Sequence, residues 1–362
     1  MEHIAARRRN TMALYYIGAF MAVRALPSAF DRARSAEKDY DVLRHTGGSS
    51  GPRVLFVGGN PGVARFYAAA AQELADATRG DVTVLGLRGF VDGRRVSRGW
   101  WGDATRWALS RPRGPFSVDE QVAHVATQID GESALAESQG RRLVVVGHSA
   151  GRCRNQFKRD RPRFDTRAID ATLVDFTIGI GGYFALKAQR DVPVVCITPY
   201  LENREADPAF RKLRRLVTSP LAPVLAFSLA SFSTLLGIVP RVVRRRLLRA
   251  AGATAGMDRV HEDVTVETMC GFGNVVTMLG LARDEMRALA KPFDGPYPAG
   301  LVLFDDPPDV WCAANGPLVD RARNAGSVIR VATDTPHAFA TRPDARRRVV
   351  ATVAELIAEV TT

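Results

Sequence analysis

The stretch "RRLVVVGHSAG" at residues 141–151 decides the fold class. Its first part is a continuous aliphatic run, which is typical of a strand buried on both faces of a parallel sheet. A Gly-x-Ser-x-Gly pattern follows directly, from Gly147 to Gly151. The small residues around Ser149 permit the tight strand-to-helix turn that exposes a nucleophilic serine. The stretch therefore predicts a strand, a turn carrying Ser149 and a following helix.

Similar apolar runs recur on both sides of this unit. They lie at 53–58, 82–87, 192–198, 300–305 and 327–332. Helical patterns separate them: one covers 64–78, one covers 117–137 and begins with a capping box of Ser117 and Glu120, and one repeats apolar residues from Val349 to Val360. The alternation predicts an α/β chain with a mostly parallel sheet and helices on both faces.

The alternation of strand and helix patterns, and the places where it is absent, divide the chain into four parts. Residues 1–40 form an Arg-rich N-terminal extension, which fits a targeting segment, an interfacial segment or a frayed helix. Residues 41–202 form the first part of the core, and residues 291–362 form its C-terminal part. Residues 203–290 break the pattern and predict a helical, apolar cap inserted between strands.

The cap contains an uncharged stretch, Leu216 to Pro240, between "RKLRR" and "RVVRRRLLR". A single helix formed by the residues after Pro223, up to Val239, would measure roughly 24 Å at about 1.5 Å per residue, short of a hydrocarbon core of about 30 Å. The stretch thus predicts a cap helix or a helix lying in one lipid leaflet with its arginines at the headgroups. The two alternatives are compatible with each other.

The net charge and the cysteine spacing limit the kinds of partner and cofactor that we expect. The formal net charge of +12 favours polyanions, anionic membrane ahead of nucleic acid, or simply a basic solvated surface. No nucleic-acid module is recognisable, so we expect no nucleic-acid partner. The cysteines lie far apart, which predicts reduced thiols and no zinc site. No metal or organic cofactor is implied. The cysteines are Cys153, Cys196, Cys270 and Cys312.

Three further stretches complete a candidate site. In "LFVGGNPGVARFY" at 55–67, a loop after a strand can direct the Asn60 N–H at an oxyanion. In "LFDDPPDVWC" at 303–312, aspartates follow a late strand, and in "DTPHAFAT" at 334–341, His337 follows the last strand. A serine, an acid and a histidine in this order, each just after a strand, match the chain order of α/β-hydrolases. His148 is expected to support the turn, while His3, His45, His124 and His261 have no catalytic context.

Together these motifs resemble one family, the lipid droplet-associated serine hydrolases. The resemblance rests on Asn60-Pro61-Gly62 with Phe66-Tyr67, Gly147-His148-Ser149, Asp309-x-Trp311-Cys312 and His337-Ala338-Phe339, and runs from about Asp41 to the end of the chain.

The resemblance implies an α/β-hydrolase fold with Ser149 as nucleophile, Asp309 as acid and His337 as base. It implies an oxyanion hole made by the backbone amides of Asn60 and of the residue after Ser149, which is Ala150. It also implies binding to lipid droplets or endoplasmic reticulum through the apolar middle segment, and neutral lipid or sterol esters as substrates. Between Leu87 and Gly93 the chain lacks the family's histidine-bearing loop.

The family's continuation after the serine, "IGGYFALK", begins here only at Ile180. Residues 150–179 therefore read as an insertion, and their many charges cannot lie in a helix packed beneath a nucleophile. Either the insertion is genuine and Ser149-Ala150-Gly151 forms a working turn, or it is an artefact such as a retained in-frame intron. Ala150-Gly151 imitates the motif, but the residues after it do not fit the strand and helix pattern on either side, which favours the artefact. Without it, Ile180 would supply the second oxyanion amide.

The sequence thus predicts a serine esterase acting on lipid acyl esters. Two alternatives are a lipid-surface protein of the same fold with impaired catalysis, and an esterase or thioesterase for soluble substrates. They differ in whether Ser149 reacts and in whether Leu216 to Pro240 determines the protein's location.

Overall fold

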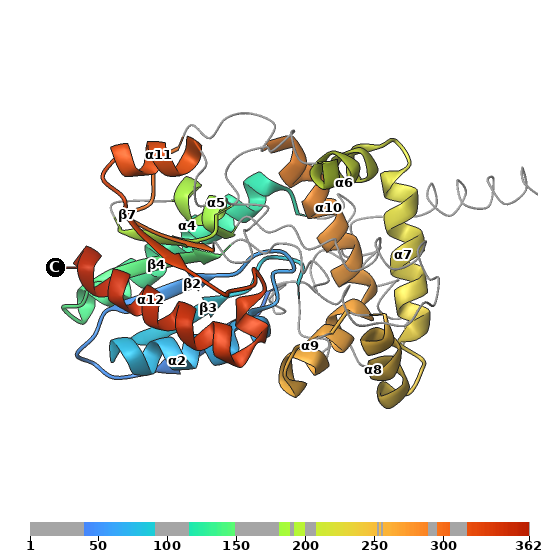
Figure 1. The fold of residues 1–362 in the computed structure, drawn as a ribbon, viewed down its shortest axis with the longest axis horizontal. Helices are drawn as coiled ribbons and strands as arrows, with labels where there is room; N and C mark the ends of the chain where they lie inside the picture. Colours follow the sequence, from blue (N-terminus) through green and yellow to red (C-terminus); the bar gives the residue numbers. More distant parts are fainter. Residues whose placement is uncertain are drawn as a thin grey trace, which may run out of the picture.

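The fold is described from a computed structural model, which covers residues 40–90, 116–148, 181–188, 192–199, 208–251, 253–254, 256–288, 295–304 and 317–361. Seven strands form one sheet in the order β1-β3-β2-β4-β5-β6-β7 (Figure 1). The strands are β1 (Val42–Thr46), β2 (Arg53–Val57), β3 (Asp81–Leu85), β4 (Leu143–His148), β5 (Val194–Ile197), β6 (Gly300–Phe304) and β7 (Val328–Ala332). Of the described strands, β1 alone runs antiparallel to its neighbour, so the predicted mostly parallel sheet is confirmed.

Helices cover both faces of the sheet. The helices of the core are α2 (Ala68–Thr78), α4 (Val118–Ser138), α5 (Gly181–Lys187), α11 (Pro317–Asn324) and α12 (Pro343–Thr361). Alternate strand residues such as Val145 join one apolar core with α4 and α5, whereas Val144 and Val146 join a second core with α2 and α12. This alternation follows from the two-residue period of a strand. Burial on both sides explains why the strands read as continuous apolar runs.

The expected strands and helices are confirmed, including the capping box of Ser117 and Glu120 at the start of α4. Two edges of the sheet differ from the expectation. The strand β1 was not expected, because "VLRHT" is short and polar, as an exposed edge permits. The strand β7 is not buried on both faces, and Val331 is 50% exposed, because among the described strands β7 pairs with β6 alone.

The segment from 208 to 288 is helical, as the sequence predicts. It forms α6 (Pro208–Thr218), α7 (Ala222–Leu236), α8 (Arg241–Ala250), α9 (Arg259–Met269) and α10 (Phe272–Ala288). These helices stand together at one end of the sheet (Figure 1). The helix α10 packs against α4 of the core and against α6, α7 and α9. It therefore joins the cap to the core.

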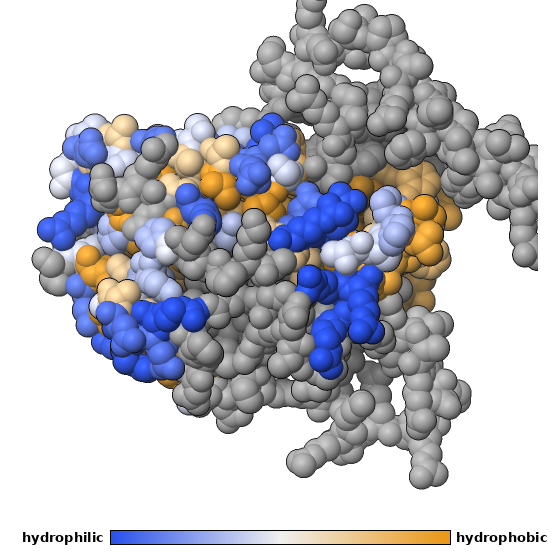
Figure 2. All heavy atoms as spheres, turned by 90° about the horizontal axis from the view of Figure 1, so that it is seen from above, coloured by the Kyte–Doolittle hydropathy of each residue, from blue (hydrophilic) through white to orange (hydrophobic). Residues whose placement is uncertain are grey.

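The outer surface of the cap is apolar along α7. Figure 2 shows an orange surface at the end of the molecule where α7 lies. The side chains exposed there and on α8 are Leu221, Val224, Phe227, Phe232, Leu235, Ile238, Val242, Val243 and Leu247. No single described helix is long and apolar enough to cross a membrane; α9 and α10, bent by 87°, pass that test as a pair by length and composition.

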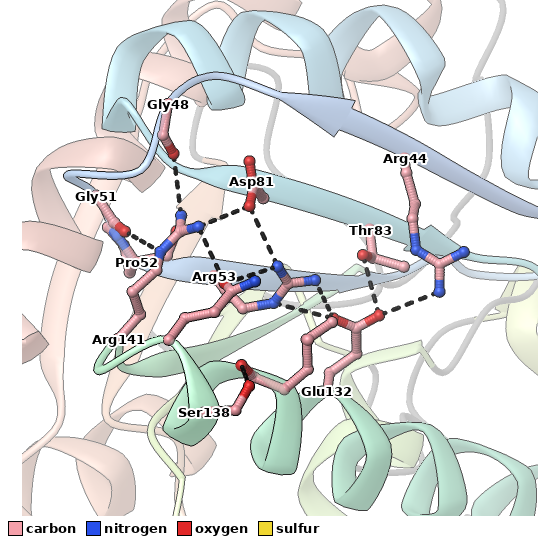
Figure 3. Close-up of polar contacts among 12 residues, drawn as sticks. Arg44, Gly48, Gly51, Pro52, Arg53, Asp81, Thr83, Glu132, Ser138 and Arg141 are labelled. Carbon is pink, nitrogen blue, oxygen red and sulfur yellow. Dashed lines mark hydrogen bonds and ion pairs between the residues drawn. The ribbon is translucent and has the colours of Figure 1, made fainter.

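A buried ion-pair network lies at the amino ends of the strands (Figure 3). Arg53, the first residue of β2, is paired with Glu132 of α4 at 2.7 Å and with Asp81 of β3 at 3.1 Å. Arg141 is also paired with Asp81, at 2.6 Å, and Thr83 donates to Glu132. Every buried charge in this network has a partner of opposite sign, as burial requires. The network fastens α4 to the sheet at the edge opposite the candidate site.

Candidate functional site

The structure brings two of the candidate residues to the carboxyl ends of the parallel strands. Asn60 follows β2, and His337 follows β7. The strand β4 ends at His148, the residue before Ser149. Ser149, Ala150, Ile180 and Asp309 lie outside the described residues. Open α/β sheets bind their ligands at this edge.

The loop after β2 is held on both sides. The Asn60 side chain is fully buried, and its Nδ2 donates to the backbone carbonyl of Met278 in α10 at 3.0 Å. The Gly59 N–H donates to the Tyr67 hydroxyl at 3.1 Å, and the Leu87 N–H donates to the Gly62 carbonyl at 2.8 Å. Within the described part of the chain, no group accepts a hydrogen bond from the Asn60 N–H. Among the described residues, the Asn60 N–H therefore has no partner that would compete with a ligand.

The imidazole of His148 lies between Tyr67 and His337. Its Nδ1 is 2.9 Å from the Tyr67 hydroxyl, and its ring centre is 5.2 Å from that of His337. Phe339 packs edge-on against the same ring at 4.9 Å. The residue before Ser149 is therefore in direct ring contact with the candidate base.

The environment of His148 fixes its charge. Burial, and to a lesser degree the neighbouring His337 ring, hold the pKa of His148 well below its usual value, although the His337 carbonyl opposes the shift. Burial also raises the pKa of Tyr67 to about 12, against the effect of the Gly59 N–H. A neutral tyrosine that accepts from Gly59 has its own proton to donate to His148 Nδ1. We therefore assign the His148 proton to Nε2, which is buried and has no hydrogen-bond partner among the described residues.

The helix expected after the nucleophile lies against the end of β4. A methyl group added at Gly181, the first residue of α5, would overlap the carbonyl oxygens of His148, Gly58 and Val57. One added at Gly147 would lie 2.7 Å from the Gly182 Cα. Gly181 thus touches the residue that precedes Ser149, although 32 residues separate His148 from Gly181 in the sequence. The last described residue before this gap in the description and the first one after it are therefore in contact.

An aspartate–histidine pair, in which His261 is buried and Asp258 is partly buried, lies in the cap, and no catalytic role was expected for this histidine. His261 Nδ1 is 2.7 Å from Asp258, and its Nε2 is 3.1 Å from the Phe66 carbonyl. Burial raises the pKa of Asp258, but hydrogen bonds from His261 and Arg346 outweigh it and hold the pKa below its usual value. Because both ring nitrogens of His261 are occupied, the pair fastens α9 to the segment after Asn60 and leaves no nitrogen for acid-base work.

Ion pairs add to this attachment. Arg65, just after the Asn60 loop, is paired with Glu267 of α9 at 2.8 Å. The other acids of α9, Glu262 and Asp263, pair with arginines of α8. The cap is therefore fastened to the Asn60 loop by charge as well as by hydrogen bonds.

One titratable residue of the site was missed by sequence reasoning. Glu285 of α10 is fully buried, and burial raises its pKa well above its usual value, against the Asn60 side chain and with a smaller contribution from Asp284. A glutamate in an otherwise apolar helical face, "MLGLARDEM", was the available signal. Within the described residues, no three His, Cys, Asp or Glu side chains form a group that could hold a metal ion.

The chain is weakly similar to several solved structures. The peroxisomal alpha-beta-hydrolase Lpx1 of Saccharomyces cerevisiae is 11% identical, with 86% of this chain and 78% of that chain covered and a TM-score of 0.48. Epoxide hydrolase I of Solanum tuberosum is 12% identical, with 88% of this chain and 94% of that chain covered and a TM-score of 0.48. A putative epoxide hydrolase of Pseudomonas aeruginosa is 18% identical, with 91% of this chain and 99% of that chain covered and a TM-score of 0.47. Likeness this low says nothing about the reaction.

No curated protein matches the chain significantly. A family match does exist. Residues 50–156, which hold the Asn60 loop, β4 and Ser149, match the lipid-droplet associated hydrolases, and the match ends just inside the segment interpreted as an insertion. The strand order, the single antiparallel strand β1 and the serine after β4 are those of an α/β-hydrolase. Over residues 50–156 the chain is therefore similar to the lipid-droplet associated hydrolases, as its motifs predict.

Proposed function

We propose that this protein is a serine ester hydrolase that cleaves acyl esters of lipids at the surface of a lipid droplet or of the endoplasmic reticulum. The observation that carries the proposal is the ring contact of 5.2 Å between His337 and His148. Because Ser149 follows His148 directly, this contact supports His337 as the base that serves Ser149. Asp309, in the segment after β6, is the proposed acid.

The proposed reaction has two halves. Ser149 Oγ attacks the ester carbonyl while His337 takes its proton, and the oxyanion is held by the N–H groups of Asn60 and of the residue after Ser149. His337 then protonates the alcohol, which leaves an acyl-enzyme. Water attacks that ester with His337 again as base, and the fatty acid departs as Ser149 regains its proton. Asp309 would orient His337 and stabilise its charged form.

The lipid part of the proposal is supported by the cap. The helix α7 exposes apolar side chains, and the helices on either side of it, α6 and α8, are rich in arginine. Part of the basic surface is already used, because Arg241, Arg245 and Arg249 of α8 pair with acids of α9. Arg246 is exposed and belongs to the face that would meet anionic headgroups.

The contact between Gly181 and His148 bears on the insertion. It supports a chain in which α5 follows Ser149 directly, as in the family, with residues 150–179 as an addition that spoils the second oxyanion donor. A catalytically impaired lipid-surface protein is thus the second candidate function for the chain as written.

Labelling with a fluorophosphonate tests both candidates. The proteins to compare are the full chain, its Ser149→Ala variant and a chain in which Ser149 is joined to Ile180. We expect strong labelling of the joined chain, weak labelling of the full chain and none after Ser149→Ala. If neither the full nor the joined chain is labelled while both are folded, ester hydrolysis is wrong and the lipid-surface protein is favoured.

A further inference from the structure

Glu285 is the buried acid for which the proposed reaction has no use. It lies on α10 with no exposed surface, and among the described residues neither of its carboxylate oxygens has a hydrogen-bond partner. An ionised carboxylate in this position would bear a large desolvation cost without compensation. Glu285 is therefore expected to be a neutral carboxylic acid, with one O–H to donate.

The polar side chain that faces Glu285 belongs to the oxyanion loop. The Asn60 side chain is a hydrogen-bonding neighbour of the Glu285 carboxyl, and its effect of lowering the pKa of Glu285 is smaller than that of burial, which raises it. Its Nδ2 is used by the Met278 carbonyl, but its Oδ1 is buried and has no partner among the described residues. Met278 and Glu285 are seven residues apart on α10 and so lie on one face of the helix. An unused acceptor on Asn60 thus lies beside an unused donor on Glu285.

Among the described residues, no positive charge contributes to the shift in the pKa of Glu285. Asp284 is the charged neighbour that acts on Glu285, and its negative charge disfavours ionisation further. Arg287 is paired with Asp284 at 3.7 Å. Of the helices packed on α10, α7 has no charged residue, and the α9 acids are paired with arginines of α8 or with Arg65. The basic residues of α6 are Arg211, Lys212, Arg214 and Arg215, and α4 presents His124, which bonds to the Gly86 carbonyl.

We propose that Glu285 is a positioning residue for the oxyanion hole: as a neutral acid it donates to Asn60 Oδ1, and α10 thereby holds the Asn60 side chain at both of its polar atoms. The Asn60 backbone N–H is then aimed by a side chain anchored twice on one rigid helix. Preorganised donors are what make an oxyanion hole effective, because they need no reorganisation during the reaction. The catalytic consequence rests on the proposed ester hydrolysis, whereas the contact itself does not.

Kinetics test the catalytic consequence. We would compare Glu285→Gln, which can still donate, with Glu285→Leu, which cannot, using p-nitrophenyl butyrate and the more active of the full and joined chains. We expect Glu285→Leu to lower kcat about tenfold with KM within about twofold, since a misaimed donor should cost less than the 10²- to 10³-fold of a deleted one. Glu285→Gln should stay within about threefold of the parent chain. The matched control is Asp284→Asn, which removes an acid from the adjacent position of the same helix and should change neither constant.

A double-mutant cycle tests the contact without any need for activity. Urea unfolding midpoints would be measured for the parent chain, Asn60→Ala, Glu285→Leu and the double variant. We expect the two single shifts not to add, because each variant removes the same interaction. Additive shifts overturn the proposal, and so does a folded Glu285→Leu protein that keeps the parent kcat. A parent chain without esterase activity overturns the proposed function alone, and the cycle then decides the fate of the contact.

Discussion

At the scale of single residues, the site is organised by groups that do not take part in bond making. The Tyr67 hydroxyl connects the Gly59 N–H of the Asn60 loop with His148, and His148 in turn touches His337. These groups come from three segments that are far apart in the sequence. Burial keeps Tyr67 and His148 neutral, so the connection between them is made by a hydrogen bond and not by charge.

This arrangement predicts a specific dependence of stability on pH. The pKa of His148 is held well below its usual value by burial first and by His337 second. Between its unfolded pKa near 6.5 and the lower folded pKa, the unfolded chain binds a proton that the folded protein does not. The stability that His148 contributes is therefore present above pH 6.5 and falls as the pH drops, by up to about 1.4 kcal/mol per pH unit.

Urea unfolding at pH 7.5 and at pH 5 measures this effect. The loss of unfolding free energy between the two pH values should be smaller in His148→Asn, which has no imidazole, than in the unaltered protein. Tyr67→Phe is the control: it removes the hydrogen bond but retains the buried ring, so it should be less stable at pH 7.5 and still lose stability at low pH. An equal loss in His148→Asn and the unaltered protein would show that His148 does not titrate in this range.

At the scale of elements, the approach of α5 to β4 depends on glycine. A side chain at Gly181 would meet three backbone carbonyls, which cannot move aside as a flexible side chain can. We expect Gly181→Ala to destabilise the protein by about 1–3 kcal/mol, as overpacking of a core does. Gly131 of α4 is the matched control, because no atom lies within 4 Å of a methyl group added there, and Gly131→Ala should stabilise by about 0.5–1 kcal/mol. Chemical unfolding of both variants is the measurement, and a neutral Gly181→Ala would mean that α5 does not rest on β4.

The elements also show what a sequence can and cannot reveal. The inner strands were predictable because burial on both faces leaves an unbroken apolar run, as in β4. The edge strand β1 is half polar, and its pairing with β3 is non-local, so no periodicity marked it. Asn60 and His337 could be predicted because motifs after strands indicate the ligand-binding edge of the sheet. Glu285 could not, because its meaning comes from a contact across 225 positions that only the folded cap creates.

At the scale of the whole molecule, the two edges of the sheet have different tasks. The amino edge holds the ion-pair network around Arg53 and Glu132, which serves stability. The carboxyl edge holds the Asn60 loop, His148 and His337, and the cap stands beside it (Figure 1). The cap is attached to this edge through Arg65, Glu267 and His261. These contacts connect the cap, which carries α7, to the segment that follows the Asn60 loop.

The apolar surface of α7 predicts that the protein binds lipid through this helix. Val224 and Ile238 are 64% and 65% exposed, and burying such side chains in acyl chains stabilises binding by roughly 1–2 kcal/mol each. The double variant Val224→Asp, Ile238→Asp should therefore bind phospholipid-coated triolein droplets at least about tenfold more weakly in a flotation assay. Val331→Asp is the control, since Val331 is also half exposed but lies on the edge strand β7. Equal loss in both variants would indicate non-specific adsorption, and loss in neither would exclude α7 as the lipid-binding surface.

If the arginines of α6 and α8 contribute, binding to droplets with anionic phospholipid should also weaken as salt is raised, because screening acts on exposed charges and not on buried apolar contacts.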